Sequence, residues 1–211
     1  MANVISFNYY KLQQAVSSSD FLFAKKKMTD EFASKQKGRL SSMALVDNDI
    51  WADFTVFESI DDLKAFAKAF HANETAKQCF SFMDFGTMNS HVFTVKKSYR
   101  PNDSSKEPYK KGNIVSFHSY KLNEGVSAED YLNAADKLIN EFALKQSGWI
   151  SSMKVFEGDT WADFVVFESM DALKSFVEAY SNSEQAKAVS PFMDFGTLKY
   201  HTFTIEQLYQ P

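Results

Sequence analysis

Residues 51–59 read "WADFTVFES" and residues 161–169 read "WADFVVFES", so one chain carries nearly the same phrase twice. A shift of 110 positions aligns residues 3–99 with 113–209 without a gap, and about half of the aligned pairs are identical. This repetition predicts a tandem duplication. We expect a first repeat at 1–99, a linker at 100–112 and a second repeat at 113–211.

The segment "RPNDSSKEPYKKG" at 100–112 is rich in Pro, Ser, Asn and Lys and has no apolar period, as is typical of a solvated linker. Fully stretched at about 3.3 Å per residue, it could span roughly 40 Å. That length would allow the two repeats to pack face to face.

Within the first repeat, the pattern predicts strand, helix, strand, strand, helix, strand. Residues 3–12 are β-branched and aromatic, whereas apolar residues in 17–38 recur near the helical period of 3.6. Two further strands in 39–58 are separated by "DND", which is typical of a hairpin. A second helix begins at Ser59, a shorter helical piece follows at 74–82, and 88–97 forms the closing strand. The second repeat has the same order.

Polar residues mark where the first helix begins and ends. Ser17 and Asp20 have the Ser-x-x-acid spacing of a helix N-terminus. Gly38, like Gly148 in the second repeat, can adopt the left-handed conformation that ends a helix.

This order predicts a four-stranded antiparallel sheet with both helices on one face. Alternation in the third strand puts bulky apolar groups on both faces, so the face away from the helices must also be covered. The predicted fold class is α+β, with two ferredoxin-like βαββαβ repeats whose antiparallel sheets pack together as a pseudo-dimeric α+β barrel. In the third strand, one face carries Trp51, Asp53, Thr55 and Phe57, and the other face carries Ala52, Phe54 and Val56.

Composition excludes several classes of function. The net charge of -4 includes no basic stripe that could follow a phosphate backbone, so we expect no nucleic-acid partner. No window approaches 18 continuous apolar residues and the N-terminus lacks a signal-peptide pattern, which predicts a cytoplasmic protein without membrane association. No phosphate loop, nucleophile elbow or metal-ligand spacing is present, so we expect neither a metal nor a cofactor. Cys79 has Val189 as its counterpart, which favours a small buried filler.

The whole pattern resembles the dimeric α+β barrel superfamily, and within it the antibiotic-biosynthesis-monooxygenase-like group, here as a tandem fusion. The resemblance rests on element order, repeat length, "FES" before a helix, and "NETAKQ" or "SEQAKA" in the short helical region. It covers nearly the whole chain. The superfamily includes cofactor-independent oxygenases acting on aromatic polyketides, haem-degrading enzymes, and members without known chemistry, so the fold alone does not choose a function.

Haem-degrading relatives use an Asn on the first strand, a Trp at the end of the third strand and a His on the following helix. Asn8 matches the first position, but Phe57 and Phe167 stand where the Trp is expected. The helix His matches only His71, which the second repeat replaces with Ser181. The set of three haem-site residues is incomplete, so haem binding ranks third, after an oxygenase and a ligand-binding barrel without chemistry.

Four residues are candidate catalytic bases. His91 and His201 recur in the closing strands, and imidazole titrates near neutral pH. Asp53 and Asp163 lie between aromatic residues, where burial would raise the pKa of a carboxyl group. The alternatives are a histidine bonded within the core, and a carboxylate paired with a Ser, Tyr or Lys of a neighbouring strand.

Six further residues are candidates for substrate binding, and they come in pairs at equivalent positions of the two repeats. The first pair differs between the repeats, which suggests that the two pockets are not equivalent, although drift explains this equally well. Both Trp residues have core packing as their alternative. The six are Asn8, His118, Trp51, Trp161, Phe57 and Phe167.

The functional hypothesis is a barrel that binds a small hydrophobic or aromatic molecule between helices and sheet, as a cofactor-independent monooxygenase. The alternative is a ligand-binding or stress-associated barrel without chemistry. The expected partner is the small molecule, and the expected assembly is an intramolecular pseudo-dimer, with a further homodimer left open. The sequence does not identify the substrate.

Overall fold

A computed structural model describes residues 3–101 and 109–209, so residues 102–108 of the expected linker lie outside the described residues. The chain divides into two compact units. Unit 1 runs to Val95 and includes the end of the chain from Ile205, whereas unit 2 is Lys96–Thr204. Each repeat therefore ends in a long strand whose last residues belong to the other unit.

Unit 1 has the predicted order of elements, including the short helix expected before the closing strand. A 3-10 turn at Ala33–Lys35 follows the first helix. The elements are β1 (Val4–Leu12), α1 (Ser18–Glu31), β2 (Arg39–Asp47), β3 (Ile50–Phe57), α2 (Ile60–Ala72), α3 (Glu74–Phe80) and β4 (Met83–Tyr99).

Unit 2 repeats this order. Its 3-10 turns lie at Ala143–Lys145 and Ser190–Phe192. The elements are β5 (Ile114–Leu122), α4 (Ala128–Glu141), β6 (Trp149–Glu157), β7 (Thr160–Phe167), α5 (Met170–Ser181), α6 (Glu184–Val189) and β8 (Met193–Tyr209).

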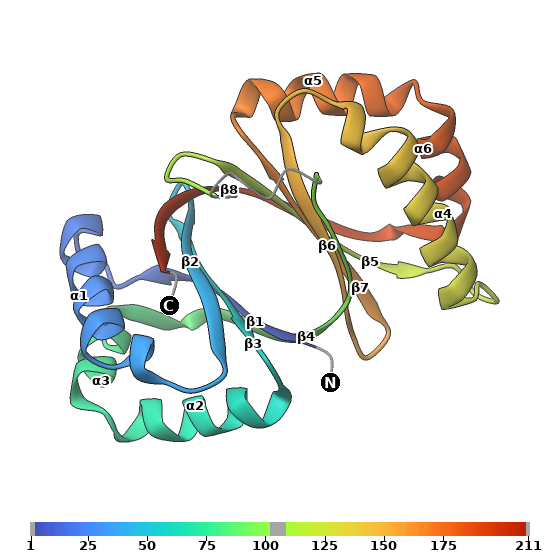
Figure 1. Ribbon diagram of the computed structural model, residues 1–211. Helices are drawn as coiled ribbons and strands as arrows, with labels where there is room; N and C mark the ends of the chain where they lie inside the picture. Colours follow the sequence, from blue (N-terminus) through green and yellow to red (C-terminus); the bar gives the residue numbers. More distant parts are fainter. Residues whose placement is uncertain (1–2, 102–108, 210–211) are drawn as a thin grey trace. The chain divides into compact units, whose positions relative to one another are not determined.

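In each unit the strands form an antiparallel sheet, in the order β4-β1-β3-β2 in unit 1 and β8-β5-β7-β6 in unit 2. Helices α1, α2 and α3 cover one face of the first sheet, and α4, α5 and α6 cover one face of the second (Figure 1). The α+β class and the ferredoxin-like topology are therefore confirmed.

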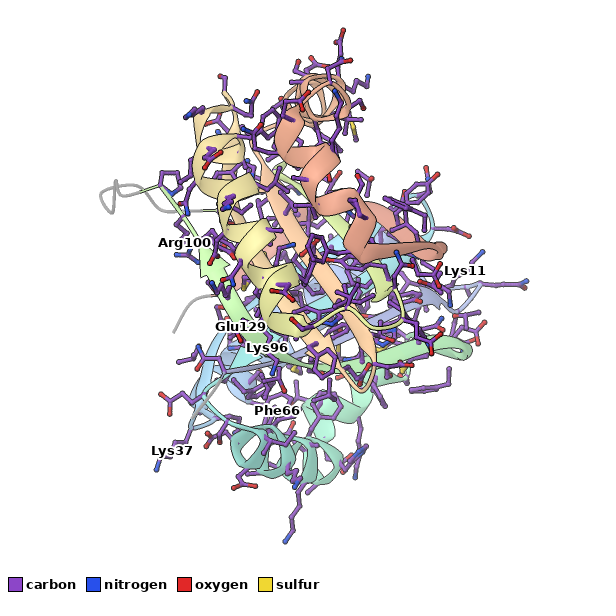
Figure 2. All side chains as sticks on the ribbon, turned by 90° about the vertical axis from the view of Figure 1, so that its right-hand side faces the viewer. Lys11, Lys37, Phe66, Lys96, Arg100 and Glu129 are labelled. Carbon is purple, nitrogen blue, oxygen red and sulfur yellow. The ribbon has the colours of Figure 1, made fainter. Side chains whose placement is uncertain are left out.

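The predicted alternation of β3 is confirmed. Trp51 packs edge-on against Phe21 of α1, and Phe57 contacts Phe66 of α2, so the odd-numbered residues face the helices. Figure 2 labels Phe66 on its helix. Phe54 belongs to the opposite face, and it is fully buried there. That face is apolar, as the sequence predicts.

The turn between α1 and β2 depends on Gly38. Its φ of 75° lies in the left-handed region, and its carbonyl accepts a hydrogen bond of 2.8 Å from the amide of Glu58. A Cβ placed here would lie 2.2 Å from Cγ of Asp62 in the first turn of α2. Glycine is therefore required both by the backbone conformation and by the close approach of α2.

No helix within residues 3–101 and 109–209 is long and apolar enough to cross a bilayer. The cytoplasmic location expected from the sequence stays a prediction.

We expect Gly38→Ala to destabilise the protein by well over 2 kcal/mol, because left-handed strain of about 1–2 kcal/mol adds to the clash with Asp62. Gly125→Ala is the matched control, since its φ is 79° but no atom lies within 4 Å of the added Cβ. Gly125→Ala should lose only the stability that the left-handed strain costs, about 1–2 kcal/mol. Urea unfolding midpoints measure both, and equal losses would contradict the role given to Asp62.

Candidate functional site

A buried ion pair lies beneath the helices of unit 1. Lys25 of α1 pairs with Oδ1 of Asp53 on β3, and their side chains are 6% and 22% exposed. The hydroxyl of Tyr10 on β1 donates a hydrogen bond of 2.9 Å to the other carboxylate oxygen. Both oxygens of Asp53 are therefore engaged.

Unit 2 contains the corresponding carboxylate with a larger set of partners. Nζ of Lys154 on β6 lies 2.7 Å from Oδ1 of Asp163, and Tyr120 donates to Oδ2 at 2.8 Å. Lys154 also donates a bond of 2.8 Å to the hydroxyl of Tyr131. Burial by itself would lower the pKa of Lys154, but Asp163 and Tyr131 outweigh it and hold that pKa above its usual range. The ammonium is therefore charged at neutral pH.

The two lysines do not occupy equivalent positions of the repeat. Ala135 is the counterpart of Lys25, and Ala44 is the counterpart of Lys154. Ala44 lies opposite Asp53 in the β2–β3 ladder, just as Lys154 lies opposite its own aspartate. A helix supplies the ammonium in unit 1 and a strand supplies it in unit 2. The buried carboxylate has kept a cation although the residue that provides it has moved, as the cost of an unpaired buried charge requires.

Each unit encloses a cavity between its helices and its sheet, and each cavity reaches the buried aspartate. The cavity of unit 1 has a volume of about 200 Å³, and that of unit 2 about 380 Å³. Ser190 lines the larger cavity where Phe80 lines the smaller one, and Ala135 replaces the long side chain of Lys25. These smaller side chains leave unit 2 more open space.

Two residues that line the unit 2 cavity each carry an unpaired polar atom. Nε1 of Trp149 and Oγ of Ser152 are buried and have no hydrogen-bond partner among the described residues. The equivalent residues of unit 1, Arg39 and Ser42, hydrogen-bond to each other. An unpaired buried donor costs about 1–3 kcal/mol, which a ligand carrying an acceptor could recover.

His118 lies on β5 in the wall of the same cavity, 3.0 Å from Oγ of Ser116 through its Nε2. Burial lowers the pKa of His118 below its ordinary value, Asp163 opposes this and Lys154 adds to it. The imidazole is therefore neutral at pH 7 and able to accept a proton.

Exposed apolar side chains line the opening of the unit 2 cavity. Val177, Phe195 and Tyr200 are 52%, 56% and 70% exposed and belong to its lining. In unit 1 the counterparts of the first and third are Ala67 and Ser90. An apolar entrance favours an apolar ligand.

The structure brings most of the predicted site residues to these cavities. Trp51 and Trp161 are exceptions, because they pack in the core against α1 and α4 and line neither cavity. Asn8, Asp53 and Phe57 line the cavity of unit 1, and His118, Asp163 and Phe167 line that of unit 2.

His91 and His201 lie away from the cavities. His91 is directly opposite Phe7 in the β1–β4 ladder, whereas Asn8 pairs with Asp53, so the imidazole occupies the sheet face away from the helices. It stacks on Phe93 at 5.2 Å, and His201 stacks on Phe203 at 5.5 Å. The predicted histidine and aspartate bases are therefore not brought together.

The three positions considered for haem degradation do come together. Asn8, Phe57 and His71 all line the unit 1 cavity. Their counterparts His118, Phe167 and Ser181 line the cavity of unit 2. Unit 1 thus has the Asn and the His but a Phe in place of the Trp, and unit 2 has none of the three residues that haem-degrading relatives use.

The sequence analysis offered a Tyr or Lys of a neighbouring strand as a partner for each aspartate, and Tyr10, Tyr120 and Lys154 fill that role. It did not single out Lys25 or Lys154, and it gave no role to Arg39 or Trp149. A signal for the lysines was present in the repeat alignment, because Lys and Ala exchange reciprocally at two positions. This exchange can be interpreted only once the structure shows that positions 25 on α1 and 44 on β2 both lie beside Asp53. Within the described residues, no group of three or more His, Cys, Asp or Glu side chains gathers as a metal site.

No protein-family profile matches the chain, and no curated protein matches it either. Solved structures do. A "putative monooxygenase" from Lactobacillus acidophilus is 12% identical, with 100% of this chain and 97% of that chain covered and a TM-score of 0.70. An anthrone oxidase-like protein is 14% identical, with coverages of 100% and 94% and a TM-score of 0.65.

A mutant chlorite dismutase from Candidatus Nitrospira defluvii is 10% identical, with coverages of 98% and 93% and a TM-score of 0.59. At such identities the likeness concerns the fold alone. The chain shares the fold of these structures, and an α+β fold of this kind is what its sequence pattern predicts.

We expect Lys25→Ala to destabilise the protein by about 3–5 kcal/mol, because it leaves the carboxylate of Asp53 buried without a cation. Adding Ala44→Lys should restore most of the loss, since it copies the arrangement of unit 2. Denaturant unfolding measures both. Lys26→Ala is the control, because Lys26 pairs with Asp30 on the surface and should contribute less than about 1 kcal/mol. No recovery in the double variant would refute the equivalence.

Proposed function

We propose that the unit 2 cavity binds a small planar aromatic molecule that carries a carbonyl or phenolic oxygen. The observation that supports it is the pair of unpaired buried polar atoms, Nε1 of Trp149 and Oγ of Ser152, on two residues that line this cavity. A ligand oxygen placed there would accept a hydrogen bond from the indole and would relieve the cost of its burial.

The rest of the lining suits a flat ring system. Leu138, Leu173 and Phe176 supply apolar surface from α4 and α5, and Phe167 supplies an aromatic face from β7. A cavity of about 380 Å³ lies within the range of sites that hold small organic ligands. The charged groups Lys154 and Asp163 satisfy each other, so the ligand does not need a charge.

We expect Trp149→Phe to weaken binding of anthrone, a tricyclic ketone, about tenfold through the lost hydrogen bond. Binding of dihydroanthracene, which lacks the carbonyl, should change less than twofold. Isothermal titration calorimetry measures both ligands. Trp161→Phe is the matched control, because Trp161 lies in the core of the same unit outside the cavity. Equal loss for both ligands would contradict the assigned hydrogen bond.

A second candidate is oxygenation of that ligand without a cofactor, and the neutral imidazole of His118 in the cavity wall favours it. With Nε2–H donating to Ser116, Nδ1 is left to remove a proton from an acidic C–H group. The resulting carbanion would reduce dioxygen. Conversion of a CH₂ group to a ketone takes one oxygen atom into the product and releases the other in water. The names of the similar solved structures support this choice.

We expect dioxygen consumption with anthrone to fall at least 100-fold in His118→Asn, because a general base typically contributes that much. His201→Asn should keep the wild-type rate, since His201 lies on the other sheet face. The base acts when neutral and burial lowers its pKa, so the rate should rise with pH and reach half its maximum below about pH 6.5. Binding without oxygen consumption would leave a ligand-binding protein and would refute the oxygenase.

A further inference from the structure

Unit 1 contains a buried guanidinium that forms no ion pair with any carboxylate of the described residues. Arg39 at the start of β2 is 8% exposed and lines the cavity of unit 1. Within the described residues, no carboxylate lies within 4 Å of it, and its side chain donates only to the hydroxyl of Ser42. A guanidinium has five N–H donors and remains charged, so one neutral acceptor leaves most of its hydrogen-bonding capacity unused.

The other charges of the cavity only partly offset this cation. Burial lowers the pKa of Arg39, and Tyr209 and Asp53 oppose this without cancelling it. Asp53 is the lining carboxylate, and Lys25 and Tyr10 engage both of its oxygens. In the ladder Ala44 lies opposite Asp53 and Arg39 lies opposite Phe57, four residues further along β3. At about 3.3 Å per residue, that separates their backbones by roughly 13 Å along the strand. The remaining titratable lining groups are His71, Cys79 and Tyr209.

Burial of an unpaired cation is costly, and the fold does not demand one at this position. Unit 2 has a neutral Trp149 there on the same backbone, so an aromatic residue satisfies the packing. The arginine of unit 1 therefore adds a charge that folding does not need. Such a charge is explained if an anion occupies the cavity beside it.

We propose that the cavity of unit 1 is a second binding site, which takes a small apolar carboxylate about one aromatic ring in size. Arg39 would hold the carboxylate through parallel N–H bonds, with Ser42 beside it. Phe66, Phe70 and Phe80 would enclose the ring. The volume of about 200 Å³ limits the ligand to a smaller body than the one proposed for unit 2. The two repeats would thus select different ligands through the residues at positions 39 and 149.

The test uses the full chain with 4-fluorobenzoate, observed by fluorine NMR. We expect saturable binding to the wild type and at least a tenfold weaker affinity in Arg39→Gln, because the charged pair is lost. Arg39→Trp, which copies unit 2, should lose binding equally and supplies a second variant if the first unfolds. Thermal unfolding confirms that each variant is folded.

Lys26→Gln is the control and should bind 4-fluorobenzoate as the wild type does, because Lys26 pairs with Asp30 on the surface and lines neither cavity. The Arg39 variants are also compared in a Trp149→Phe background, so that binding in unit 2, or its failure, does not change the result. In that background the neutral 4-fluorobenzamide should bind at least tenfold more weakly than the acid. Unchanged affinity in both Arg39 variants, equal binding of the amide, or displacement of the ligand by an equal concentration of inorganic phosphate would each overturn the proposal.

Discussion

A carboxylate buried between a sheet and its helices must have a cation, and this requirement organises both repeats. Asp53 and Asp163 occupy the same place on equivalent strands, and each receives a tyrosine hydroxyl from the neighbouring strand. The ammonium comes from α1 in one unit and from β6 in the other. Two different solutions to the same electrostatic problem indicate that the pair itself, rather than either lysine position, is what the fold retains.

The position of that cation also shapes the cavities. In unit 1 the lysine crosses from the helix to the sheet and takes up space beside the aspartate. In unit 2 the lysine rises from the sheet, Ala135 leaves the helix side open, and the cavity is larger. The duplicated fold thereby carries two chemically different interiors, one with a buried guanidinium and one with an indole N–H. After a duplication, the two repeats do not need to bind the same ligand.

The sheet separates the predicted site residues into two groups. Asp53 and Asn8 share the helix-facing surface, whereas His91 lies on the opposite face beside Phe93. The proton transfer proposed for the cavity of unit 2 therefore rests on His118, which the sequence analysis favoured for binding rather than for proton transfer. Strand periodicity predicts which residues of one strand share a face, because successive side chains point to opposite faces. It does not predict the register of β4 against β1, and that register decides that His91 and Asn8 face opposite sides of the sheet.

The sequence by itself determined the order of elements, the duplication, the alternation of β3 and the glycine at Gly38, because these depend on local periodicity and on backbone conformation. It also placed Asp53 and Phe57 on one face of the third strand, and the register of β1 against β3 then adds Asn8 to that face. Only the tertiary structure showed that Lys25 and Lys154 both neutralise a buried aspartate. It also showed that Arg39 and Trp149 line equivalent cavities. These residues are far apart in the sequence, and they come together only when the helices pack on the sheet. No local sequence pattern specifies which side chains then meet.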